Sequence, residues 1–319
     1  MKIFNKKNIT ILVAVFVVYL IGSLLINTGM IDSYIYMNIV TIGINILLAV
    51  SLNLITGFTG QLSLGHAAFM AVGAYASGIL TAKLGQPFIV GILGAAFFAA
   101  IAGVIIGIPT LRLKGDYLAI ATLGFGEIIR IIALNNDYIG GAIGLNDIPQ
   151  YTTWAWLYFA MVVAIVVIEN FVKSDHGRAC IAIREDEIAA ESAGVNTTYY
   201  KVFTFVIGAV FAGVAGALYA NYFYFIKPDS FGFMKSIDIL VFVVFGGMGS
   251  TLGAVVGAIV LSIISMFLQG IPELRMVIYA VVLFLIMVFR PQGLIGKTPF
   301  KFFKKRGVAN VGNRSEETI

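Results

Sequence analysis

Gln61, Ser63 and His66 are the first side chains that could hold a polar solute, because they lie among glycines between two apolar runs. Irregular backbone at membrane depth persists only against protein or beside a water-filled cavity. The stretch 57–75 is therefore a candidate lining of a path across a membrane. The alternative is a cytoplasmic turn followed by a helix in which Ser63 and His66 bond to neighbouring helices. The path candidates in this stretch are Gly57, Gly60, Gln61, Ser63, Gly65, His66 and Phe69.

A second glycine-rich stretch, GGMGS at 246–250, lies in the other half of the chain. It precedes Gly253 and Gly257, which are four residues apart on one helix face, so a packing seam explains it better than a path. Two glycine-interrupted segments, one in each half, nevertheless suggest an internal repeat with a path at its interface. The path candidates here are Gly246, Gly247 and Gly249.

The segment 173–201 is the largest hydrophilic insertion between apolar runs. Acidic residues open its middle, Ala189 and Ala190 favour a helix, and Gly194 stands where a C-terminal cap belongs. This order predicts a short amphipathic helix at the membrane surface that docks a cytoplasmic partner; the alternative is a solvated connector. The docking residues would be Arg184, Glu185, Asp186, Glu187, Ala189, Ala190 and Gly194.

Glu127 and Arg130 are a pair of opposite charges within a predicted span. A lone charge at the bilayer centre costs about 2.5 to 3.5 kcal/mol on insertion scales. Three residues apart on a helix, the two side chains share a face, so they should neutralise each other toward the bundle interior. The alternative is that they bind a zwitterionic substrate.

The amino-acid composition predicts that transmembrane helices position these polar and charged side chains. Apolar residues make up 60% of the 319 residues and charged ones 12%, too little charge to cover a water-facing surface. The apolar stretches are continuous instead of alternating, which argues against a barrel. We therefore expect an all-α polytopic membrane bundle of eight to ten transmembrane helices. The single cysteine, Cys180, excludes an internal disulfide, and no metal site is expected.

The membrane domain is predicted to fill residues 1–296, and the basic stretch 297–319 is a predicted disordered cytoplasmic tail. The segment 237–268 is longer than one span, so it should form two short spans or a re-entrant pair meeting at 246–249. With the N-terminus cytoplasmic, most of the 21 Lys and Arg lie inside, as the positive-inside rule requires, and both termini are cytoplasmic. The outer side receives Lys83, Lys227, Lys235 and Arg275. The other predicted spans are 9–26, 37–56, 63–81, 88–109, 117–134, 154–171, 202–225 and 274–289.

The sequence contains none of the motifs expected of an ATPase, a zinc protease or a serine hydrolase. A Walker loop, an H-E-x-x-H zinc motif and a G-x-S-x-G nucleophile motif are all missing from it. Apart from Glu127, Arg130 and, less clearly, His66 or Asp238, mid-membrane charges that could couple an ion gradient are also missing. We therefore expect a transport subunit that is not an enzyme, and either driven by partners or passive.

Six motifs follow one another along the chain: GQLSLGHAAF-x3-GAY at 60–75, LRLKGDYLAIATLGF at 111–125, GGAIGL at 140–145, REDEIAAESAGVN at 184–196, FGGMGS-x2-GA at 245–254 and RPQGL at 290–294. In these motifs the sequence resembles the permease subunits of ABC importers for branched-chain amino acids, specifically the longer of the two paired permeases. The resemblance runs from about 37 to 297. It implies a type II-like importer fold.

The resemblance also implies partners: a second homologous permease, two cytoplasmic ATPase subunits and an external or periplasmic solute-binding protein. The chain would lie in the bacterial cytoplasmic membrane and bind no cofactor and no nucleic acid, with ATP and Mg²⁺ on the ATPases. The segment 173–201 would be the coupling helix, and the loops 135–153 and 226–236 the external docking surface. ABC importers carry E-A-A-x3-G in this helix, whereas here Ile188 stands at the Glu position and Glu187 lies one residue early.

Other cargoes and mechanisms stay open at this point. Urea and short-amide permeases are similar along the same motifs, and a stand-alone ion-coupled carrier or channel is a third possibility. The sequence does not rank leucine, isoleucine and valine, and it does not distinguish a permease homodimer from a heterodimer. It also identifies no residue that contacts substrate.

Overall fold

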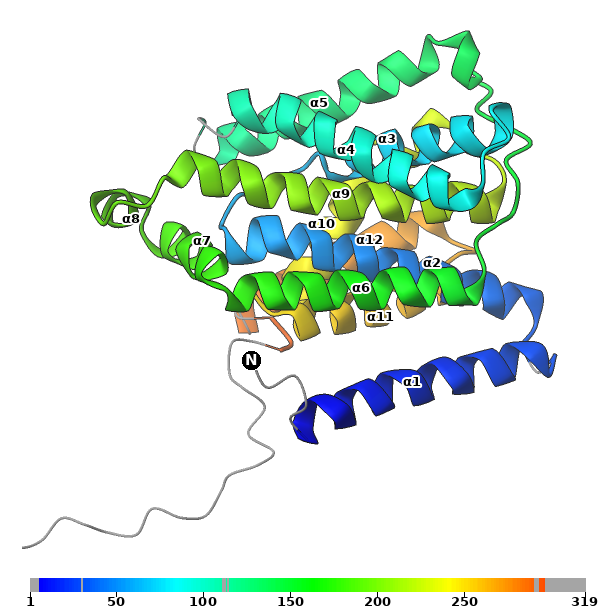
Figure 1. Cartoon of the computed structure of the whole chain (residues 1–319), viewed down its shortest axis with the longest axis horizontal. Helices are drawn as coiled ribbons and strands as arrows, with labels where there is room; N and C mark the ends of the chain where they lie inside the picture. Colours follow the sequence, from blue (N-terminus) through cyan, green and yellow to red (C-terminus); the bar gives the residue numbers. More distant parts are fainter. Residues whose placement is uncertain (1–5, 30, 111–112, 114, 290–292, 296–319) are drawn as a thin grey trace, which may run out of the picture.

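Helices make up the computed structural model, which describes residues 6–29, 31–110, 113, 115–289 and 293–295 (Figure 1). Within these ranges the β-type pairing is confined to one antiparallel bridge, between Leu145 and Ile226. The all-α fold predicted from composition is therefore confirmed. The predicted tail 297–319 lies outside the described residues.

Apolar runs separated by polar turns give the helices their bounds. In chain order they are α1 (Lys6–Asn27), α2 (Ser33–Leu52), the π-helix η1 (Asn53–Phe58), α3 (His66–Gly78), the π-helix η2 (Ile79–Lys83), α4 (Phe88–Thr110), α5 (Asp116–Leu134), the 3-10 helix η3 (Asp137–Ile139), α6 (Trp154–Lys173), α7 (Asp175–Glu185), α8 (Glu187–Ser192), α9 (Thr197–Phe223), the 3-10 helix η4 (Pro228–Phe231), α10 (Phe233–Gly246), α11 (Thr251–Phe267) and α12 (Pro272–Phe289).

Five helical segments of the described part of the chain are long and apolar enough to cross a bilayer: α2 with η1, α4, α5, α6 and α9. Shorter apolar stretches lie at Val15–Ile26 in α1 and in α11. The chain is thus a multi-pass membrane protein.

Two predicted spans are interrupted at glycines. The predicted span 63–81 begins as a helix only at His66, because the residues just before it form no regular structure. The predicted segment 237–268 breaks as expected, since α10 ends at Gly246 and α11 begins at Thr251. The two short helices pack against each other. Lys235 at the start of α10 and Gln269 just past α11 line the same cavity, so the pair begins and ends at one end of the bundle.

Small residues let the central helices approach closely. A Cβ on Gly73 of α3 would lie 2.1 Å from the carbonyl oxygen of Gly213 in α9, and one on Gly216 would lie 2.0 Å from that of Met70. Backbone contact of this kind is typical of membrane helix interfaces, where larger side chains would hold the helices apart. α9 therefore lies in the middle of the bundle, packed against α3 and α4.

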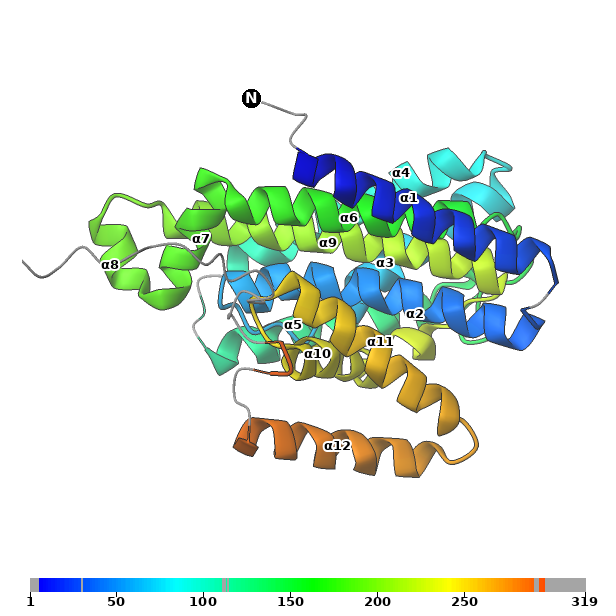
Figure 2. The same ribbon diagram turned by 90° about the horizontal axis from the view of Figure 1, so that it is seen from below.

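The two ends of the bundle differ. α7 and α8 project at one end, and the chain after α5 runs along the opposite end to reach α6 (Figure 1). At that opposite end the backbones of Leu145 and Ile226 exchange hydrogen bonds of 2.8 and 3.0 Å, which joins the two loops predicted to be external. Figure 2 shows α1 and α12 on opposite sides of the bundle, with α6, α9 and α2 between them.

Candidate functional site

The first glycine-rich stretch is a π-helix followed by a segment without regular structure. α2 continues into η1, six buried residues in π-helical conformation, a form that is often found at functional sites. The backbone then reverses at Gly60, whose φ of +75° suits glycine, and the amide of Gln61 donates to the carbonyl of Ile55 at 3.1 Å. The chain reaches His66 without a regular helix, so several polar groups need partners from other elements.

Neighbouring helices supply some of these partners. The imidazole Nε2 of His66 lies 2.8 Å from the Ser51 hydroxyl, and His66 is fully buried. The amide of Leu64 donates to the Thr122 hydroxyl at 3.0 Å, and the amide of Ala67 to that of Ser236 at 3.1 Å. α5 and α10 thus hold the start of α3, and His66 bonds to α2 as the alternative to a path predicts.

Other buried polar atoms in the same stretch have no protein partner among the described residues. They are both side-chain polar atoms of Gln61, the hydroxyls of Ser63 and Tyr75, and the Nδ1 of His66. An unpaired buried polar group costs about 1 to 3 kcal/mol, so such groups are found where water or a ligand can reach them. This favours a path near Gln61 and Ser63, and the assignment stays a prediction.

The second glycine-rich stretch is the tight turn between α10 and α11. Gly247 and Gly249 have φ values of +117° and +81°, and the Ser250 hydroxyl caps α11 by accepting from the amide of Gly253 at 3.1 Å. A Cβ on Gly257 would lie 2.2 Å from the carbonyl oxygen of Phe242 in α10. Gly253 and Gly257 therefore lie in the packing seam that their spacing predicts.

The structure brings both glycine-rich stretches to one arginine of α7. The Arg184 guanidinium donates to the carbonyl of Gly57, and a Cβ on Gly249 would lie 2.6 Å from its Nη1. A Cβ on Gly60 would lie 3.0 Å from the Arg184 Cγ, and the Asn53 side-chain oxygen accepts from the amide of Gly249 at 2.9 Å. We call this cluster the Arg184 junction: Asn53, Gly57, Gly60, Arg184 and Gly249.

The sequence does not predict the Arg184 junction as a unit. It predicts that Arg184 contacts a cytoplasmic partner, and it assigns no role to Asn53. The contacts join residues up to 196 positions apart, and no local pattern encodes such a pairing. The one sequence signal is the concentration of glycines, which permits close approach but does not say to what.

The hydrophilic insertion forms two helices where one was predicted. Arg184 and Glu185 end α7, and Asp186 is the N-cap of α8, where its carboxylate accepts from the amides of Ile188 and Ala189 at 2.9 and 3.0 Å. The predicted docking residues therefore belong to two helices. The chain breaks at Asp186 because an aspartate is favoured at an N-cap over a helix interior.

Gly194 ends α8 as predicted. Its φ is +86°, its amide donates to the carbonyl of Glu191 at 2.9 Å, and the amide of Val195 donates to that of Ala190 at 3.0 Å. This is the Schellman arrangement, in which glycine avoids the cost of a Cβ at positive φ. Ile188, which stands where the general ABC importer pattern E-A-A-x3-G has Glu, is 72% exposed on α8.

The insertion is anchored to the bundle by an ion pair and by a buried thiol. Glu187 and Lys201 pair at 2.6 Å, which joins α8 to the start of α9. Cys180 is buried in α7, and burial raises the pKa of its thiol to about 11, so the thiol stays protonated at neutral pH. A cavity of about 300 Å³ also lies beside the hydrophilic insertion 173–201. Its other walls are the start of α5 and the turn that contains Gln61.

Glu127 and Arg130 are paired, but not toward the bundle interior as predicted. The Arg130 Nε lies 2.8 Å from Glu127, and its Nη1 lies 2.9 Å from the carboxylate of Asp229 in η4. The two side chains of α5 are 31% and 34% exposed, because Arg130 reaches toward the loop that closes this end of the bundle. The sequence gives no sign of Asp229, since it lies 99 residues away from Arg130.

The chain matches one protein family over most of its length and is similar to several known permease proteins. Over residues 34–287 the chain matches the family described as "Branched-chain amino acid transport system / permease component". It is 37% identical over 301 residues to the high-affinity branched-chain amino acid transport system permease protein LivM of Escherichia coli, covering 83% of this chain and 71% of that one. The probable branched-chain amino acid transport permease protein LivM of Methanocaldococcus jannaschii is 27% identical over 319 residues, covering 81% and 92%. The related permease protein LivH of Salmonella typhimurium is 27% identical over 280 residues, covering 79% and 91%. No solved structure matches this chain.

Proposed function

This chain belongs to the family of permease components of branched-chain amino acid transport systems, and we propose from that membership that it moves leucine, isoleucine or valine inward as half of an ATP-driven pathway. Its relatives include both LivM and LivH proteins, which indicates a paired permease system. The proposed second half is a homologous permease that packs beside this one.

Two further kinds of partner complete the proposal. Two cytoplasmic ATPase subunits bind ATP and Mg²⁺, so this chain itself binds no cofactor, and α7 with α8 docks into them. An external solute-binding protein docks at the opposite end, on the joined loops 135–153 and 226–236. The proposed location is the cytoplasmic membrane with both termini inside, supported by the distribution of Lys and Arg.

The Arg184 junction carries the mechanism. Because Arg184 ends α7 and contacts both Gly57 and Gly249, a displacement of α7 by the ATPases moves η1 and the α10–α11 turn together. These are the interrupted segments of the two halves of the chain, and shifting them would open or close the path at their interface. ATP-driven closure of the ATPases is proposed to act through this contact.

The test is reconstitution in liposomes of this chain with its second permease, the ATPases and the binding protein. We expect ATP-dependent uptake of radiolabelled leucine that needs all four components. Uptake by this chain alone would instead identify a self-sufficient carrier or channel. ATP-dependent uptake of urea without leucine would keep the importer mechanism and change the cargo.

A further inference from the structure

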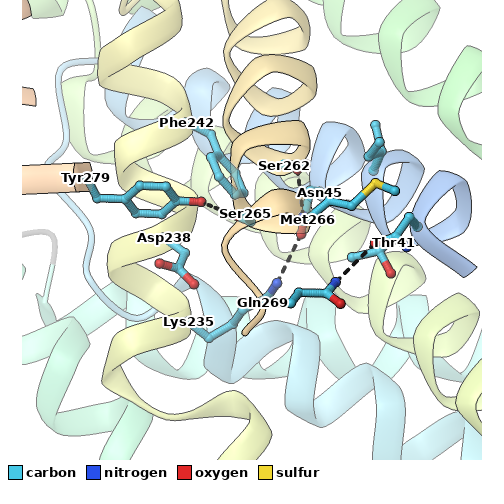
Figure 3. Close-up of a pocket in the computed structure, with 12 residues that line it drawn as sticks. Thr41, Asn45, Lys235, Asp238, Phe242, Ser262, Ser265, Met266, Gln269 and Tyr279 are labelled. Atoms are coloured by element: carbon cyan, nitrogen blue, oxygen red, sulfur yellow. Dashed lines mark hydrogen bonds between the residues drawn. The ribbon is translucent and has the colours of Figure 1, made fainter. Parts of the chain in front are cut away.

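A polar cavity of about 140 Å³ lies between α2, α10, α11 and α12 (Figure 3). One ordered water needs only about 10 to 15 Å³, so the cavity has room for a group of several heavy atoms. Asn38 in α2, Lys235 in the first turn of α10 and Gln269 just past α11 place the cavity near the end of the bundle opposite α7 and α8. The proposed external loops lie at that same end.

Two opposite charges line this cavity from one helix. Lys235 and Asp238 are three residues apart on α10, and both side chains point into the cavity (Figure 3). The Lys235 ammonium also donates to the side-chain oxygen of Asn45 at 3.0 Å, which holds it at the cavity wall. An ammonium and a carboxylate that line one cavity are complementary in charge to the carboxylate and the ammonium group on the α-carbon of an amino acid.

Neutral polar groups from the surrounding helices flank the charges. The Asn45 amide donates to the Ser262 hydroxyl at 3.0 Å, and the Gln269 amide donates to the Asn38 oxygen at 3.2 Å. The cavity therefore offers fixed hydrogen-bonding groups in addition to charge. Such a small set of convergent polar groups is typical of sites that orient a ligand.

Apolar side chains complete the wall. Ile42, Phe242 and Met266 line the same cavity. They provide a surface for an aliphatic group next to the charged end, which is the arrangement that a branched-chain amino acid requires.

We propose that this cavity binds the zwitterionic end of the transported amino acid, with Lys235 on its carboxylate and Asp238 on its ammonium group. The inference rests on the proposed function and names residues for it. Its place near the outer end makes it the first site that cargo meets after leaving the binding protein. Charge-assisted hydrogen bonds of this kind are the strong ones in ligand recognition.

The test measures binding of radiolabelled leucine to the purified permease and ATPase complex in nanodiscs, without the binding protein. We expect Lys235→Met and Asp238→Asn each to weaken leucine binding about tenfold or more, as expected for the loss of one charge-assisted contact. Lys83→Met is the matched control, because Lys83 is an outer lysine away from the cavity and should leave binding unchanged.

A ligand analogue separates recognition from folding. Leucinol lacks the carboxylate, so the unaltered complex should prefer leucine to leucinol, and Lys235→Met should abolish that preference. The double variant Lys235→Met with Asp238→Asn tests whether the two side chains only neutralise each other. If it binds leucine as well as the unaltered complex does, the two charges do not bind the amino acid and the proposed site is wrong. If the reconstituted importer takes up no leucine at all, the proposed function fails instead.

Discussion

Arg184 is the side chain on which the proposed coupling depends most directly. Its guanidinium donates to the Gly57 carbonyl and lies against Gly249, so one residue of α7 contacts both interrupted segments. A guanidinium presents several donors in a fixed plane, which lysine cannot reproduce with its single ammonium group.

We therefore expect Arg184→Met, and also Arg184→Lys, to reduce leucine uptake at least about tenfold while ATP hydrolysis continues. Without the guanidinium contacts, a movement of α7 driven by the ATPases would no longer displace Gly57 and Gly249. The measurement is leucine transported per ATP hydrolysed in liposomes. Arg178→Met is the control, since Arg178 lies on the same helix and pairs with Asp175 at an exposed position. Equal losses in both variants would contradict a specific role for Arg184.

At the scale of elements, the seam between α3 and α9 depends on glycines that allow backbone contact. A Cβ on Gly73 would lie 2.1 Å from a carbonyl oxygen of α9, whereas a Cβ on Gly124 of α5 would meet no atom within 4 Å. The same substitution should therefore have opposite effects at the two positions.

Gly73→Ala should lower the free energy of unfolding by about 1 to 3 kcal/mol through overpacking. Gly124→Ala should be neutral or stabilising by up to about 1 kcal/mol, because alanine favours a helix more than glycine does. The melting temperatures of the two purified variants in detergent test this difference. A Gly73→Ala variant that melts like the unaltered protein would show that α3 and α9 are not in backbone contact.

The end of α8 depends on one backbone conformation. Gly194 has φ of +86° and open space around it, so a substitution acts through backbone strain and not through a clash. Valine strains this conformation, whereas asparagine adopts it more readily.

Gly194→Val should abolish leucine uptake and substrate-stimulated ATP hydrolysis while leaving membrane insertion intact, because the docking helix loses its defined end. Gly194→Asn should retain most of both activities. Pull-down of the ATPase subunits and ATP hydrolysis rates measure the effect. Normal coupling in Gly194→Val would remove the docking assignment of α8.

At the scale of the whole molecule, the two ends of the bundle should face opposite sides of the membrane. Tyr138 lies at one end and is 57% exposed, and Ile188 lies at the other and is 72% exposed. The natural cysteine, Cys180, is buried with a raised pKa, so it should contribute little background to thiol labelling.

A membrane-impermeant maleimide should therefore label Tyr138→Cys in right-side-out vesicles and Ile188→Cys only in inside-out vesicles. Added ATPase subunits should protect Ile188→Cys, because α8 is their proposed docking element. The unaltered protein is the control for Cys180. Labelling of both positions from one side would contradict the proposed orientation.

Features that depend on composition and local order were determined by the sequence itself. Continuous apolar runs specify helices in a bilayer, the glycines at 246–249 predict the break between α10 and α11, and Gly194 predicts the end of α8. Each of these follows from a residue's own conformational preference or from its immediate neighbours.

Tertiary structure alone decided which distant groups meet. The contacts of Arg184 with Gly57, of Arg130 with Asp229 and of Lys235 with Asn45 span 127, 99 and 190 residues. Helix packing sets these contacts, and a helical period identifies the face of a helix without naming the helix that it meets. The Arg184 junction and the proposed amino acid site therefore became visible only once the bundle was assembled.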